Sequence, residues 1–196
     1  VTTMRGTTFY YNGDELGMSN IRFENIEDYN DVDTRNKYQF LKENNGDLKA
    51  FLEERKQGSR ENGRTPMQWN TTANAGFTTS KPWLKVNSNY VNINVEAQEK
   101  SPNSSLNYFK KLTKLRKQNP ILVYGKFEVV DKENPNIFAY TRELNGKKWL
   151  VALNFTDKES KFEANTKNAK IILGNYLKPS KNTVLKPYEA VILELK

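Results

Sequence analysis

Cysteine and histidine are both absent from the 196 residues of this chain. Without cysteine, disulfides, thiolate nucleophiles and cysteine-bound zinc or iron–sulfur centres are excluded. Without histidine, the commonest general base and the commonest zinc ligand are missing, so the chain cannot build a Ser-His-Asp triad by itself. Carboxylates, lysines and tyrosines are the groups that remain for acid–base chemistry.

Long hydrophobic runs are also missing. No stretch of about 18 apolar residues occurs, and no apolar leader that follows positive charge opens the chain, so we predict neither a membrane span nor a signal peptide. We expect a cytoplasmic protein, and a periplasmic or secreted one stays open, because the chain begins with Val1 and looks like part of something longer. A leader of that longer chain would not be visible here.

The formal net charge of +8 and the pI near 9.4 are compatible with nucleic-acid binding. The basic residues are scattered, however, and their densest group, residues 110–117, falls on the polar side of a predicted helix. A solvated helix face is the better explanation of that group, so no nucleic acid is expected as a partner.

The first part of the chain mixes short regular segments with long irregular ones. Residues 7–11 read as a short strand that ends in an Asn-Gly turn, and "DLKAFLEERKQ" (47–57) has apolar residues at helical spacing. Residues 61–104 have little periodicity, and a loop of that length is usually functional or lies on a larger scaffold. Residues 104–119 predict a helix with an apolar stripe, which Pro120 ends.

After Pro120 the hydrophobic pattern changes to a period of two residues. This pattern predicts strands at "KFEVVD", "NIFAYTREL", "KKWLVALNF", "KIILGNY" and "EAVILEL", with Asn145–Gly146 as the strongest hairpin signal. We therefore predict two domains, 1–119 and 120–196, the second an all-β antiparallel sandwich.

Several motifs carry a resemblance across nearly the whole chain. The segments "MRGTTFYYNGDELGM", "IEDYNDVDTRN", "SRENGRTPMQW", "NAGFT", "KPWLKVN" and "LRKQNPILVYG" occur in an order and spacing that resemble the α-glucosidases of glycoside hydrolase family 13. Within that family the likeness is to the group of oligo-1,6-glucosidases, dextran glucosidases and sucrose isomerases.

The resemblance implies a fold. It makes residues 1–119 the end of a catalytic (β/α)8 TIM barrel: Thr7–Tyr11 as strand eight, residues 12–103 as a long loop insertion, and residues 104–119 as helix eight. Residues 120–196 are then the C-terminal β-sandwich. Active sites of barrel enzymes lie on the loops that follow the strands, where residues 12–103 would be found.

The resemblance also implies a retaining mechanism, with a nucleophilic Asp, an acid/base Glu and a stabilising Asp. In the family these three residues come from strands upstream of Val1. We therefore expect no catalytic residue in this chain, no activity of the chain alone, and no metal or cofactor.

By resemblance, three residues of this chain bind substrate. Arg60 occupies the position of an arginine that helps an upstream Asp to hold the non-reducing glucose, and its planar fork of donors suits both a carboxylate and a sugar hydroxyl. Asp33 and Lys37 fall at positions that face the leaving-group sugar. The family has a longer Glu at the first of these and, in some relatives, an Asn at the second.

Structural roles stand beside these functional ones. Arg60 is open to a purely structural reading as a loop-to-carboxylate salt bridge. Met67 and Trp69 are expected as core anchors, and Trp83 either packs structurally or lines a pocket mouth. Adjacent side chains point apart, so Asp14 and Glu15 are not expected to act as a catalytic dyad, and hydrogen bonds to backbone or arginine are their expected role.

The main functional hypothesis is part of a retaining, exo-acting α-glucosidase that hydrolyses short α-1,6-linked gluco-oligosaccharides, such as isomaltose. The alternatives are a sucrose isomerase of the same family, a non-catalytic carbohydrate-binding fragment, and a sandwich that only stabilises the barrel. The expected partners are the oligosaccharide substrate and the upstream barrel of the same polypeptide. We expect the full-length protein to be a monomer.

Overall fold

The chain folds into two compact units in a computed structural model that describes all residues, Val1–Lys196. One unit comprises residues 1–9 and 108–196, and the other comprises residues 10–107. The predicted boundary between residues 119 and 120 stays a prediction.

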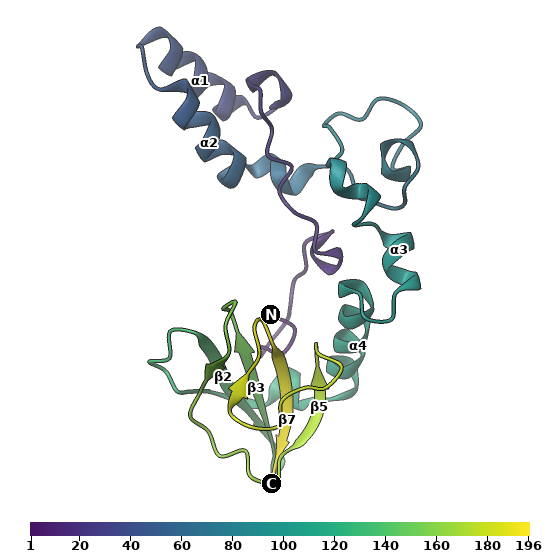
Figure 1. Cartoon of the computed structure of the whole chain (residues 1–196), viewed down its shortest axis with the longest axis vertical. Helices are drawn as coiled ribbons and strands as arrows, with labels where there is room; N and C mark the ends of the chain where they lie inside the picture. Colours follow the sequence, from purple (N-terminus) through teal and green to yellow (C-terminus); the bar gives the residue numbers. More distant parts are fainter. The chain divides into compact units, whose positions relative to one another are not determined.

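A five-stranded antiparallel sheet forms the centre of the first unit (Figure 1). Its strand order is β1-β2-β3-β7-β5, and β4 and β6 form a separate two-stranded sheet. The strands are β1 (Lys126–Val130), β2 (Ile137–Leu144), β3 (Lys147–Asn154), β4 (Ser160–Lys161), β5 (Lys170–Gly174), β6 (Val184–Leu185) and β7 (Ala190–Leu195). The five strands predicted from the period-two pattern are therefore confirmed, as is their antiparallel arrangement.

The predicted hairpin at Asn145–Gly146 joins β2 to β3. Both residues have positive φ, 51° and 76°, as a two-residue turn of type I′ requires. Leu144 and Lys147 pair directly on either side of this turn. The turn residues thus fix the register of the two longest strands.

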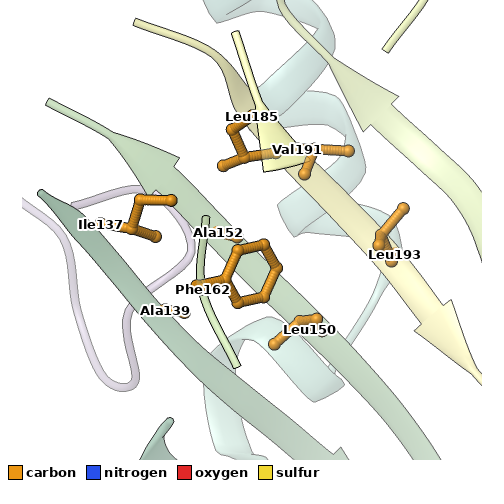
Figure 2. Close-up of a cluster of buried hydrophobic side chains, with 8 residues drawn as sticks. All are labelled: Ile137, Ala139, Leu150, Ala152, Phe162, Leu185, Val191 and Leu193. Carbon is orange, nitrogen blue, oxygen red and sulfur yellow. The ribbon is translucent and has the colours of Figure 1, made fainter. Parts of the chain in front are cut away.

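One face of the five-stranded sheet packs against the two-stranded sheet (Figure 2). Ala139 on β2 and Ala152 on β3 are cross-strand neighbours, and both are fully buried. Their small side chains leave room for the ring of Phe162, which follows β4, and Leu185 of β6 contributes to the same core. This two-layer core makes the unit a β-sandwich, as predicted.

The other face of the sheet carries helices. Tyr140, Trp149 and Ile192 form a second core with α5 (Ile121–Tyr124) and with the apolar stripe of α4 (Ser105–Gln118). The predicted helix over residues 104–119 is confirmed by α4, which ends before Pro120.

Arg142 lies fully buried beneath the beginning of the chain. Its guanidinium donates hydrogen bonds to the carbonyls of Thr3 at 2.6 Å, Leu122 at 2.9 Å and Gly125 at 2.8 Å. Arg116 on α4 donates to the carbonyls of Thr2 and Met4, each at 2.8 Å. Two arginines thus bind the first residues of the chain to the β-sandwich.

The predicted strand at Thr7–Tyr11 is wrong for this structure. These residues have no strand assignment, and the Phe9 side chain is 86% exposed. A strand needs a neighbour that completes its hydrogen-bond ladder, and no strand of this chain pairs with residues 7–11.

The second unit consists of helices and short turns. Its α-helices are α1 (Val32–Glu43), α2 (Leu48–Gly58) and α3 (Val95–Lys100), and its 3-10 turns are η1 (Asp14–Leu16), η2 (Ile26–Asp28), η3 (Arg60–Arg64), η4 (Ala73–Gly76) and η5 (Ser88–Val91). The prediction of a helix at 47–57 is confirmed by α2. The sequence did not predict α3, which is short and lies inside the expected loop. No helix in the chain is both long and apolar enough to cross a membrane.

Met67 and Trp69 differ in burial, although both were predicted as core anchors. Met67 packs with Leu16 and Leu106, as expected. Trp69 is 47% exposed, so its prediction is wrong. The intervening Gln68 takes the interior place, because its amide donates hydrogen bonds to Asn89 and to the carbonyl of Ile93.

Candidate functional site

The candidate site lies at the base of a helical hairpin. Helices α1 and α2 contact each other, and a short connection at residues 44–47 joins them (Figure 1). A short connection makes neighbouring helices antiparallel, so the start of α1 lies beside the end of α2. Asp31 caps the first of these ends, and Arg60 follows the second.

Arg60 forms an ion pair with each of two carboxylates. Its Nη2 donates to Oδ1 of Asp31 at 2.6 Å and to Oδ2 of Asp33 at 3.0 Å. Asp31 is largely buried, whereas the side chains of Arg60 and Asp33 are 60% and 84% exposed. The structure thus brings together two of the three residues that the sequence predicted for substrate binding, and their role in binding stays a prediction.

Asp31 is a residue of the site that the sequence analysis missed. Its carboxylate caps α1, accepting hydrogen bonds from the backbone N–H of Thr34 at 3.0 Å and from its hydroxyl at 2.8 Å. The hydroxyl hydrogen bond lowers the pKa of Asp31, with a smaller contribution from Arg60. The signal was present, since an Asp three residues before Thr at the start of a helix is a capping pattern.

Lys37 has a different partner. Its ammonium group lies over the ring of Phe51 on α2, 5.9 Å from the ring centroid, and the guanidinium of Arg55 lies 5.5 Å from the same centroid. The structure therefore directs Lys37 toward α2 and gives it no ion pair with Asp33.

Glu61 is a buried carboxylate that holds the backbone next to Asp31. It is 2% exposed, and its Oε1 accepts a hydrogen bond from the backbone N–H of Asn30 at 2.6 Å, whereas its Oε2 has no hydrogen-bond partner. The bond holds Asn30, which immediately precedes Asp31. No pattern in the sequence indicates that this carboxylate is buried.

A cleft lies beside this cluster in the same unit. It has a volume of about 530 Å³, and its lining includes Glu27, Asn30, Asn74, Lys81, Trp83 and Tyr90. Trp83 is 75% exposed. Trp83 thus lines a cleft, and its role at the mouth of a substrate pocket stays a prediction.

Asp14 and Glu15 form no catalytic pair. Oε2 of Glu15 accepts the backbone N–H of Gly13 at 2.9 Å, as expected for a carboxylate that stabilises a local turn. No group of three or more acidic side chains gathers in a way that could hold a metal ion.

Two substitutions of Asp31 distinguish its role as a helix cap from its role as a charged group. We expect Asp31→Ala to destabilise α1 by about 1 kcal/mol, because the cap is lost, and Asp31→Asn to cost only a few tenths, since asparagine also caps helices. Both variants remove the stronger ion pair of Arg60. Urea unfolding followed by circular dichroism measures the difference, and equal losses for the two variants would contradict the assigned cap.

The same carboxylate gives the stability a pH dependence. Folding lowers the pKa of Asp31 from its ordinary value near 3.8. Its contribution is therefore complete above that value and is lost as the pH falls through the lower pKa of the folded state. Acid should reduce the stability difference between the wild type and Asp31→Asn.

Two family models match most of the chain. The family model described as the catalytic domain of α-amylase matches residues 1–125, and the model of the maltogenic amylase C-terminal domain matches residues 127–192. The oligo-1,6-glucosidase of Bacillus cereus is 41% identical over 98% of this chain, which covers 36% of that protein.

Solved structures give the same picture. The trehalose-6-phosphate hydrolase of Bacillus licheniformis in complex with PNG matches 100% of this chain with a TM-score of 0.93 and 35% identity, and the chain covers 37% of it. The isomaltulose synthase of Klebsiella matches 100% of this chain with a TM-score of 0.91 and 34% identity, over 36% of its own length. This chain thus spans little more than a third of the relatives it matches.

Proposed function

Since this chain belongs to the α-amylase family, glycoside hydrolase family 13, we propose that it is part of a retaining, exo-acting α-glucosidase. The proposed substrates are short α-1,6-linked gluco-oligosaccharides of the isomaltose type. In this proposal the chain supplies substrate-binding residues and the C-terminal β-sandwich, and the bond-breaking carboxylates come from another part of the polypeptide.

The Arg60 cluster carries the proposal. Asp31 and Asp33 hold one end of the guanidinium through Nη2, while Nη1 and Nε have no partner in this chain. A planar guanidinium held in this way can donate its remaining N–H groups to a sugar hydroxyl or to a further carboxylate in a fixed direction. That geometry suits recognition of one terminal glucose, which is the requirement for exo-action.

A sucrose isomerase is the second candidate. The likeness to an isomaltulose synthase supports it. Both reactions pass through a covalent glucosyl intermediate and differ in whether water or the released sugar attacks it.

A carbohydrate-binding module built on the sandwich has weaker support. Such a module needs an exposed aromatic platform, but Tyr140 and Trp149 are buried in the core beneath the helices. Phe155 and Tyr188 are the more exposed aromatics of this region, and they lie outside the central strands. A cytoplasmic location and a monomeric full-length protein stay predictions.

Product analysis tests the proposal. We expect the full-length protein to release glucose from isomaltose, with the α-anomer formed first in a proton NMR time course, because a double displacement retains configuration. Isomaltulose formed from sucrose would instead support the isomerase, and turnover of trehalose 6-phosphate alone would contradict both. Inversion at the anomeric carbon would overturn the retaining mechanism.

The chain alone provides a second test. The 196-residue chain, purified without other protein, should not hydrolyse p-nitrophenyl α-glucoside, because the expected nucleophile and acid/base residue are not in it. Turnover by the pure chain would show that its own carboxylates perform the chemistry.

A further inference from the structure

The cleft beside the Arg60 cluster has the polarity of a site for a neutral ligand. Two acids, Glu27 and Asp28, and two lysines, Lys81 and Lys85, line it, so their formal charges cancel. Asp28 and Lys85 also form an ion pair at 2.5 Å. A phosphate or another anion would find no net positive charge here, whereas an uncharged polyhydroxyl compound would find both donors and acceptors.

Trp83 gives the same cleft an apolar surface. Trp83 is 75% exposed and lines the cleft together with the polar residues Asn30, Asn74 and Tyr90. A pyranose ring presents C–H groups on its faces and hydroxyls around its edge, so it pairs naturally with an aromatic plane that has amides and hydroxyls beside it. A cleft of about 530 Å³ lies in the range typical of small-molecule sites.

The backbone that carries Trp83 is held in place. Its carbonyl accepts a hydrogen bond from Nδ2 of Asn30 at 2.9 Å, and the next residue, Leu84, is buried against Phe23 and Tyr29. Asn74 fixes the preceding loop through hydrogen bonds to the carbonyls of Thr78 and Ser80. The indole is therefore presented on a supported backbone, which lowers the entropic cost of binding.

The cleft and the Arg60 cluster share a short segment of backbone. Asn30 lines the cleft and bonds to Trp83, while its own backbone is held by Glu61. Asp31, the next residue, forms the ion pair with Arg60. One short segment therefore connects the proposed grip on the terminal glucose to the wall of the cleft.

From this geometry we infer that the cleft is a further carbohydrate subsite, in which Trp83 stacks against an outer glucosyl unit of a longer oligosaccharide. This inference rests on the proposed function, which places the reacting glucose at Arg60 and therefore makes the cleft an outer subsite. It adds a preference for chain length, because a disaccharide held at Arg60 would not need the cleft, whereas a tetrasaccharide would occupy it.

The test compares two substrates in the full-length protein. For Trp83→Ala we expect kcat/KM with isomaltotetraose to fall about tenfold, whereas kcat/KM with isomaltose stays within about twofold of the wild type. Trp83→Phe keeps an aromatic plane and should recover most of the loss. Phe40→Ala, which removes an exposed aromatic of α1 that does not line the cleft, should change neither substrate.

Equal losses for the two substrates, or no loss for either, would overturn the inference. Circular dichroism of each variant separates a folding defect from a binding defect. Titration of isomaltotetraose into the wild type and Trp83→Ala, followed by calorimetry, keeps the two proposals apart. Trp83-dependent binding without isomaltose turnover would contradict the proposed function and support the subsite. Isomaltose turnover without Trp83-dependent binding would support the proposed function and contradict the subsite.

Discussion

Replacing Arg60 by alanine in the full-length protein is expected to lower kcat/KM for isomaltose by roughly 30- to 900-fold, the range for losing a charged hydrogen bond in a closed substrate pocket. Two effects combine in this loss. The substrate hydroxyl loses a donor, and Asp31 and Asp33 are left close together without the cation that pairs with them. Steady-state kinetics with isomaltose measures the change.

Two variants make the Arg60 experiment specific. Arg60→Lys keeps the positive charge but loses the planar fork, so its activity should lie between those of the wild type and the alanine variant. Arg22→Ala removes an exposed arginine that has no assigned part in the site and should leave the kinetics unchanged. If Arg60→Ala behaved as the wild type, the guanidinium would be a surface salt bridge and nothing more.

Replacing Arg142 by leucine should reduce the free energy of unfolding of the β-sandwich by about 3–5 kcal/mol, the size of effect seen when one partner of a buried charged interaction is removed. The carbonyls of Thr3, Leu122 and Gly125 would lose a buried charged donor. Burial lowers the pKa of Arg142 and so disfavours its charged form. The three carbonyl groups offset this effect, because they accept hydrogen bonds from the charged guanidinium.

Urea unfolding monitored by the fluorescence of the buried Trp149 measures this loss. Lys148→Ala is a suitable control, because Lys148 lies on the neighbouring strand and makes only a long ion pair with Glu143 at 3.7 Å. It should change the stability by less than about 0.5 kcal/mol. A similarly small change for Arg142→Leu would mean that the three carbonyls find other partners.

The parts of the fold that the sequence predicted correctly depend on local rules. Asn145–Gly146 determines its own turn, since both residues readily adopt the positive φ that the turn needs. The apolar stripe of α4 and the apolar residues of β2 and β3 predict surfaces that are buried within the first unit, and the structure buries them there. Thr7–Tyr11 shows the limit of this reasoning, because a strand propensity cannot supply the neighbouring strands.

The candidate site was predictable only in part, for a related reason. Resemblance identified Arg60 and Asp33 as site residues. Their ion pair, however, depends on the antiparallel packing of α1 against α2, which no local sequence pattern predicts. Asp31 was missed because its capping role gave no hint of an ion pair with a residue beyond α2. Glu61 was missed because a carboxylate is normally expected in solvent, whereas here it holds the backbone of Asn30.

The position of Arg60 and Asp31 at the base of the α1–α2 hairpin has a consequence for engineering. The opposite end, where Asn44, Asn45 and Gly46 make the turn, takes no part in the ion pairs. Exposed turns of this kind tolerate inserted peptides with a small entropic cost. A fluorescent reporter or an affinity tag could therefore be carried at that tip while the ion pair between Arg60 and Asp31 is left intact.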